Sequence, residues 1–201
     1  VLLLVFLWSA RLSIYLTIRN WGKSEDARYL KIRKNNEPNF RYKSAYIIFG
    51  LQSVLSWIVG SILFIAIEND HPLIWIDILG FSIALFGIVY ESVADYQLML
   101  FKSNIKNRGK LLQSGLWKFS RHPNYFGEIV LWIGVTLIAL PVLSGWQLAT
   151  LLSPVFVYVL LTRISGIPML ENRAQKKWGS DPDYIAYLER TPKLILKKPK
   201  A

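Results

Sequence analysis

Five long apolar blocks constrain the fold of this chain more than any other feature. A bilayer core about 30 Å thick requires roughly 20 mostly apolar residues in a helix that rises about 1.5 Å per residue. The blocks that reach or approach this length are 1–18, 44–67, 73–93, 128–143 and 146–164. The sequence therefore predicts an all-α integral membrane bundle with about five spans, formed by residues 1–201 as a single domain.

Basic residues alternate between the connections that join these blocks. Segments 19–43, 102–121 and 163–201 hold eight, six and nine of the 24 Lys and Arg residues, whereas 68–72 and 141–146 hold none. Because Lys and Arg accumulate in cytosolic loops, we expect cytosolic loops at 19–43 and 101–122 and a cytosolic tail at 165–201. Arg11 alone departs from the alternation. The bacterial inner membrane is the expected location, and the endoplasmic reticulum is the alternative.

The composition also narrows the classes of function. The net charge of +11 is explained by topology and by attraction to anionic lipids, and no soluble module remains that would bind nucleic acid. The absence of Cys excludes disulfides and thiolate catalysis. The two His residues, His71 and His122, fall on opposite sides of the predicted membrane, so we predict no metal site.

The chain begins at Val1 inside an apolar block, without an initiator Met or a basic stretch before it. This pattern is more typical of a truncated membrane span than of a signal peptide. We therefore expect a further segment upstream.

Two carboxylates lie near the end of the third block. Glu91 and Asp95 are four residues apart, so a helix places both on one face. A carboxylate inside the membrane costs about 2.5 to 3.5 kcal/mol on insertion scales, which favours a wet or cationic cavity over lipid. The alternative is that Asp95 already lies in the interface and that Glu91 pairs with a loop Arg.

The stretch SRHPNYFGE, residues 120–128, places polar chemistry at the start of the fourth block. Pro123 suits the first turn of a helix, which predicts a helix start near His122. The unpaired N–H groups of that start, next to Arg121, would attract an anion. Asn124 and Glu128 share one face of the helix. The alternative is a helix cap with Tyr125 at the membrane interface.

Three further polar clusters reach the same predicted side. The basic loop around Lys110 could be a lid over a ligand or a plain connector. Arg163 and Glu171 bracket a Gly and a Pro, which predict a break in the helix. Tyr184 and Tyr187 share one face of a short amphipathic helix that could lie flat on the membrane or close a pocket from below.

Together these residues resemble a known family. The steroid 5-alpha-reductase C-terminal superfamily is similar over nearly the whole chain, and the similarity is closest to its uncharacterised bacterial membrane branch, domain of unknown function 1295. The segment from Glu91 to Glu171 carries the specific part. The matching motifs read ExxxDYQ from Glu91, NxGK from Asn107, GLW from Gly115, SRHPNYFGE from Ser120, RxSGIPxLE from Arg163 and YxxY from Tyr184.

The resemblance implies a membrane reductase that takes hydride from NADPH and reduces a carbon–carbon double bond of a steroid-like or isoprenoid lipid. Its partners would be the bilayer and this hydrophobic lipid. No catalytic residue is assigned, and Glu91 and Tyr125 are candidates. By the same resemblance, the dinucleotide would be held by Asp95, Arg121, Asn124, Arg163 and Tyr187, with Glu91, Lys110, His122, Tyr125, Glu128, Glu171 and Tyr184 nearby.

One position departs from the family pattern. Steroid reductases carry a Tyr ahead of the first cytosolic loop that helps to activate the substrate carbonyl, and Trp8 stands at the similar place here. An indole cannot act as that acid. A rival resemblance is to isoprenylcysteine and phospholipid methyltransferases, which share an RHPxYxG-like motif and use S-adenosylmethionine. Their adjacent acidic residues are not matched, because Asn172 follows Glu171. A noncatalytic lipid-binding protein is the third reading.

Overall fold

The computed structural model describes residues 1–22, 27–68 and 71–198. Residues 23–26 of the first basic loop, residues 69–70 of the next connection and residues 199–201 of the tail lie outside the described part. The described residues form helices and no strand, as predicted. The α-helices are α1 (Leu2–Asn20), α2 (Ala27–Asn36), α3 (Phe40–Ser44), α4 (Leu51–Ile67), α5 (Trp75–Ser103), α6 (Pro123–Ala139), α7 (Leu152–Val159), α8 (Ile167–Trp178) and α9 (Pro182–Arg190).

Shorter helical turns extend or join the long helices. Ala45–Gly50 and Leu160–Ile164 are π-helical, and they continue α3 into α4 and extend α7. Four 3-10 turns cover Ile105–Asn107, Gly115–Lys118, Leu140–Val142 and Gly145–Leu151. The predicted break before α8 is confirmed, since Ser165 and Gly166 leave helical geometry between the π turn and Ile167.

Within the described residues, five helical segments are long and apolar enough to cross a membrane, which makes the chain an integral membrane protein. They cover Leu2–Asn20, Phe40–Ile67, Trp75–Ser103, Pro123–Val142 and Gly145–Trp178. The third runs ten residues beyond its expected end near residue 93. Residues 94–103 contain neither Gly nor Pro, so nothing in that stretch stops the helix before Asn104 accepts a hydrogen bond from the Lys106 N–H.

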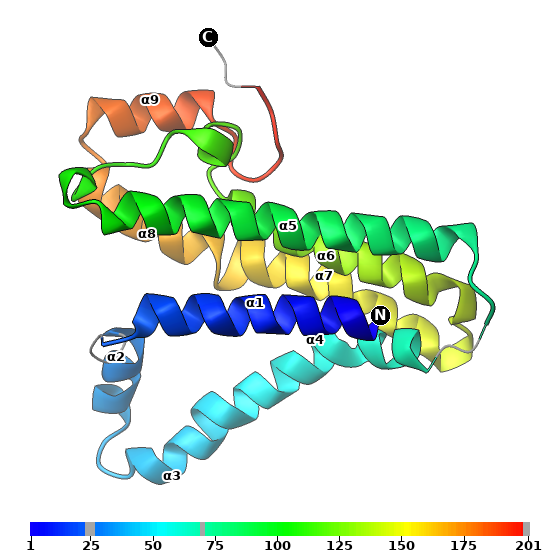
Figure 1. Ribbon diagram of the computed structural model, residues 1–201. Helices are drawn as coiled ribbons and strands as arrows, with labels where there is room; N and C mark the ends of the chain where they lie inside the picture. The colour runs from blue at the N-terminus through cyan, green and yellow to red at the C-terminus, as the bar shows by residue number, and fades with distance from the viewer. Residues whose placement is uncertain (23–26, 69–70, 199–201) are drawn as a thin grey trace.

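The arrangement of the helices groups the basic segments at one end of the bundle (Figure 1). Helices α5, α6 and α7 run side by side with α1, while α4 slants away toward α3. The C-terminal ends of α1 and α5 lie at the same end of the bundle as α2, α8 and α9. We call this end of the bundle the basic end. The connections at 71–74 and 140–146 lie at the opposite end. This grouping agrees with the alternation of Lys and Arg along the sequence.

The tightest packing in the bundle is between α5 and α6, whose backbones touch at glycines. A Cβ atom on Gly87 would lie 2.5 Å from the Leu131 nitrogen and 2.7 Å from the Gly127 oxygen. One on Gly80 would lie 2.7 Å from the Gly134 oxygen. In a membrane, small residues such as these glycines allow two helices to approach closely enough for strong dispersion contacts.

The buried core surrounds this contact. Ala84 and Ile88 of α5 meet Leu131, Trp132 and Val135 of α6. Leu4 of α1, Ile62 of α4 and Val157 of α7 complete the cluster. Ser153 of α7 also donates a hydrogen bond to the Val59 carbonyl of α4, with an oxygen–oxygen distance of 2.5 Å. All five spans therefore converge on the α5–α6 pair.

Replacement of a glycine by alanine adds one methyl group and tests whether the α5–α6 contact depends on the missing side chain. We expect Gly87→Ala to lower the free energy of unfolding by about 1 to 3 kcal/mol, because the new Cβ meets backbone atoms that cannot move independently. Gly60→Ala in α4 is the matched control, since its Cβ would meet nothing within 4 Å. That change should be neutral or stabilising by up to about 1 kcal/mol. Thermal unfolding in detergent measures both, and equal effects would contradict the packing argument.

Candidate ligand pocket and buried charge cluster

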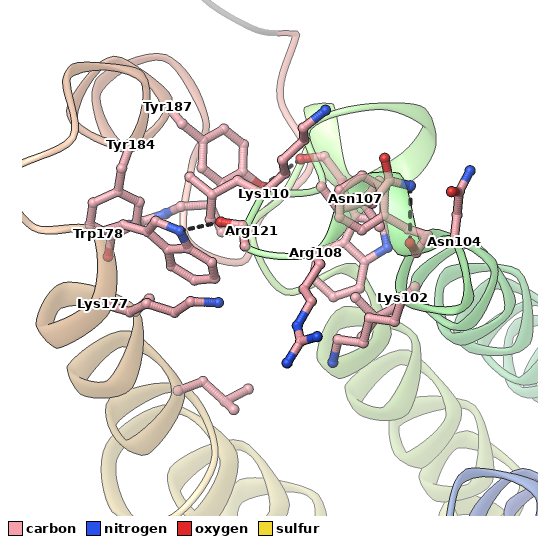
Figure 2. Close-up of a pocket in the computed structure, with 18 of the residues that line it drawn as sticks. Lys102, Asn104, Asn107, Arg108, Lys110, Arg121, Lys177, Trp178, Tyr184 and Tyr187 are labelled. Atoms are coloured by element: carbon pink, nitrogen blue, oxygen red, sulfur yellow. Dashed lines mark hydrogen bonds between the residues drawn. The ribbon is translucent and has the colours of Figure 1, made fainter.

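A cavity of about 600 Å³ opens at the basic end of the bundle. Its walls come from the last turns of α5, the loop 104–112, the start of α6, and helices α8 and α9. Figure 2 shows Lys177 of α8 reaching into the opening from one side and Lys102 and Arg108 from the other. The volume lies within the range of about 300 to 1,000 Å³ that is usual for small-molecule sites.

The pocket is strongly cationic. Among its lining residues are the five cationic side chains Lys102, Arg108, Lys110, Arg121 and Lys177, against the single acidic Glu171. Arg121 Nη1 lies 3.0 Å from Glu171 Oε1, so part of this charge is compensated. The Lys177 ammonium lies 4.2 Å from the centre of the Trp178 ring. The lining therefore carries more cationic than acidic side chains, and such an excess attracts anions.

Aromatic side chains also line the pocket, and hydrogen bonds hold two of them in place. The Tyr187 hydroxyl donates to the Trp117 carbonyl at 2.7 Å, and the Trp117 indole donates to the Ala94 carbonyl at 3.1 Å. Burial raises the pKa of the Tyr187 hydroxyl above its ordinary value, and it raises that of Tyr184 as well. Both hydroxyls therefore stay protonated at neutral pH and remain hydrogen-bond donors.

The basic loop before α6 is an ordered wall of the pocket. The Leu116 N–H donates to Gln97 Oε1 at 2.9 Å, and Asn107 Nδ2 donates to the Phe101 carbonyl at 3.0 Å. Gly109 adopts a φ of 85°, which few other residues tolerate. Its carbonyl accepts a hydrogen bond from the Trp178 indole at 2.6 Å. The loop is thus fastened to both α5 and α8, which is more than a plain connector requires.

The start of α6 lies where the sequence predicts it. His122 is the residue before the helix and Pro123 occupies its first turn. The His122 ring stacks against Tyr125 with centroids 5.7 Å apart, and its Nε2 lies 3.4 Å from Glu171 Oε1. His122 and Arg121 both line the pocket.

A second group of polar residues is buried deeper, between α1, α5 and α6. Arg11 Nη2 lies 2.7 Å from Glu91 Oε1, and Arg11 Nη1 lies 3.0 Å from Asp95 Oδ2. Asn124 Nδ2 donates to Asp95 Oδ1 at 3.3 Å. The two carboxylates therefore face a cationic group rather than lipid, and that group is Arg11 of the first span instead of a loop Arg.

Glu128 completes this buried charge cluster. Its two carboxylate oxygens accept hydrogen bonds from Trp132 Nε1 at 2.9 Å and from Trp8 Nε1 at 3.1 Å. The Trp8 and Trp132 rings also meet edge to face, with centroids 5.8 Å apart. Trp8, which departs from the steroid-reductase pattern, thus serves as a hydrogen-bond donor that ties α1 to α6.

The predicted site residues divide between these two places. The pocket is lined by Lys110, Arg121, His122, Glu171, Tyr184 and Tyr187. The buried charge cluster contains Glu91, Asp95, Asn124 and Glu128. Tyr125 stacks on His122 but does not itself line the pocket, and Arg163 is exposed on the π turn before α8.

Sequence reasoning missed several residues of both sites. Lys102, Arg108, Lys177 and Trp178 line the pocket, and Arg11 anchors the cluster. The four pocket residues lie in the basic segments 102–121 and 163–201. The charge of those segments was already explained by the membrane topology, so it gave no separate signal of a pocket. For Arg11 there was a clear signal, because it is the one basic residue outside the alternation.

The fold and the pocket define the class: an integral membrane protein with five spans in the described residues and a cavity lined by cationic side chains at one end. The chain belongs to the family described as protein of unknown function DUF1295, whose model matches residues 1–191. It is 34% identical over 70 residues to a probable O-methyltransferase, ustE, of Ustilaginoidea virens. That alignment covers 35% of this chain and 25% of the relative, so the chain matches only about a quarter of that protein's length. No solved structure gives a significant match.

Removal of the buried guanidinium tests the charge cluster. We expect Arg11→Met to destabilise the protein by about 3 to 5 kcal/mol, because Glu91 would lose its cationic partner and Asp95 would keep only the Asn124 amide. Arg41→Met on the exposed surface of α3 should change stability by no more than about 0.5 kcal/mol. Thermal unfolding in detergent measures both. Equal stability of the two variants would show that the contacts of Arg11 contribute nothing.

Proposed function

We propose that this protein is a membrane-embedded reductase that binds NADPH at the basic end and reduces a carbon–carbon double bond of a steroid-like or isoprenoid lipid. The observation that carries the proposal is the charge of the pocket, where five cationic side chains face one carboxylate. NADPH carries a pyrophosphate and a further phosphate, so it is the kind of ligand that such an excess of positive charge attracts.

The residues in the pocket fit this group in three respects. The guanidinium groups of Arg108 and Arg121 can donate two parallel hydrogen bonds to a phosphate. The rings of Trp117 and Trp178 offer flat surfaces for a base or a nicotinamide. Apolar side chains of α5 and α8, Leu98 and Leu170 among them, line the same cavity.

The chemistry needs a hydride at one carbon of the double bond and a proton at the other. Bound NADPH supplies the hydride and leaves as NADP⁺. The proton must come from another group, and Trp8 cannot provide it because its indole N–H is occupied by Glu128. Of the two candidate catalytic residues, Tyr125 is the better placed, since it stacks on His122 at the pocket, whereas Glu91 is paired with Arg11.

A second candidate is an S-adenosylmethionine-dependent methyltransferase. It is favoured by the relative named as a probable O-methyltransferase. S-adenosylmethionine, however, carries a sulfonium and an ammonium against one carboxylate. A pocket with four more cationic than acidic side chains disfavours this net positive ligand.

Cofactor titration separates these candidates. NADPH should raise the unfolding temperature of the detergent-purified protein more than NADH or S-adenosylmethionine, because only NADPH carries the additional phosphate. At 100 times the dissociation constant, binding stabilises the folded state by about 2.7 kcal/mol. A shift with S-adenosylmethionine and none with NADPH would exclude the reductase. If neither cofactor stabilises the protein, the noncatalytic lipid-binding alternative becomes the better reading.

Arg121 tests whether the pocket itself holds the cofactor. We expect Arg121→Gln to weaken NADPH binding by about ten- to a hundredfold, since a charge-assisted hydrogen bond contributes about 1.5 to 3 kcal/mol. Glu171 keeps Lys193 as an ionic partner in this variant, so the fold should survive. Arg173→Gln on the exposed surface of α8 is the matched control. Unchanged NADPH affinity in Arg121→Gln would reduce Arg121 to a residue of the membrane topology.

A further inference from the structure

The segment after α9, residues 191–197, runs back along the residues that lead into α6, and we call it the C-terminal strap. The Arg121 N–H donates to the Pro192 carbonyl at 2.9 Å, and the Lys197 N–H donates to the Phe119 carbonyl at 3.2 Å. Ser120 Oγ donates to the Leu194 carbonyl at 2.9 Å. The strap therefore pairs with the backbone that carries Arg121.

The seam between the strap and residues 119–121 is buried at Ser120 and Thr191, whereas Lys193, Ile195 and Lys197 are exposed. Ser120 is 0% exposed and Thr191 is 2% exposed. The Ser120 hydroxyl also accepts a hydrogen bond from the His122 N–H at 3.2 Å, so it joins the strap to a second pocket residue. Hydrogen bonds that are shielded from water are costly to break, so the bonds of Ser120 hold the strap against the residues that carry Arg121.

Lys193 of the strap shares a carboxylate with the pocket. Its ammonium lies 3.2 Å from Glu171 Oε2, while Arg121 Nη1 lies 3.0 Å from Glu171 Oε1. Arg121 and Glu171 line the cavity, but Lys193 does not, and its side chain is 55% exposed. Lys193 thus compensates the only acidic side chain of the pocket lining from outside the cavity.

The arrangement has an electrostatic consequence for ligand binding. Glu171 is an internal anion that competes with a ligand for Arg121. When Lys193 takes part of the carboxylate's charge, Arg121 is left more available to a phosphate. Without Lys193 the charge of Glu171 would be left to Arg121 and His122, and more of it would oppose an anion that enters beside Arg121.

We propose that the strap sets the affinity of the pocket for anions, with Lys193 as a positioning residue that acts through Glu171. The inference rests on the proposed function only for the identity of the ligand, since any phosphate-bearing anion would be affected alike. It adds to the site a residue that never touches the ligand.

The test is a double-mutant cycle on the full chain in detergent, with NADPH and inorganic pyrophosphate as probes and calorimetric titration as the measurement. Lys193→Gln should weaken both probes about two- to fivefold, the range that a half-exposed ion pair supports. In a Glu171→Gln background the same change should have no effect, because the carboxylate through which Lys193 acts is gone. Lys193→Arg should keep wild-type affinity, and Lys198→Gln is the control for loss of one tail charge.

The outcomes show separately whether the role of Lys193 or the reductase assignment fails. Wild-type affinity in Lys193→Gln, or a loss that persists in the Glu171→Gln background, overturns the role of Lys193. Binding of pyrophosphate without NADPH overturns the reductase assignment alone, and the cycle with pyrophosphate still tests the strap. A wild-type protein that binds neither probe contradicts both.

Discussion

The close approach of α5 and α6 determines where every other polar group of this protein can lie. Gly87 and Gly127 bring the two backbones into contact, and Gly127 also faces the backbone of Glu91. That register sets Glu91 and Asp95 of α5 against Asn124 and Glu128 of α6. It also places the start of α6 beside Asp95, about two turns before α5 ends at Ser103. Wider side chains at the glycines would separate the helices and remove both arrangements at once.

The buried charge cluster follows from this contact and in turn fixes α1. Three carboxylates inside a membrane bundle are tolerated only with partners, and Arg11, Trp8 and Trp132 supply them. Arg11 and Trp8 both come from α1. Their polar contacts require particular partners on α5 and α6, whereas apolar side chains can pack against lipid or against another helix equally well. The cluster is therefore well suited to set the rotation and depth of α1 against the α5–α6 pair.

Features encoded locally could be predicted from the sequence. The spans follow from apolar length, the start of α6 from Pro123, and the break before α8 from Gly166 and Pro168. Long-range partners could not be predicted. Arg11 is 84 residues from Asp95, and the Trp178 indole is 69 residues from the Gly109 carbonyl it binds. Neither pairing leaves a periodic signal.

The division of the candidate site has the same origin. Asp95 and Arg121 were expected around one dinucleotide because the family motif contains both. In the structure they belong to different layers, since Asp95 faces Arg11 across the bundle while Arg121 lines the pocket with Glu171. A motif reports which residues occur together in sequence, and only packing decides which of them share a cavity.

Charge is what separates the two layers in function. In the deeper layer, carboxylates outnumber cations and hydrogen-bonding partners come from the bundle itself, so the cluster is built to hold helices together. In the pocket, cations outnumber the single carboxylate, and that carboxylate is shared with Lys193 from outside. Since anions are attracted where cationic side chains outnumber carboxylates, the pocket, rather than the more deeply buried cluster, is the better place for the proposed anionic cofactor.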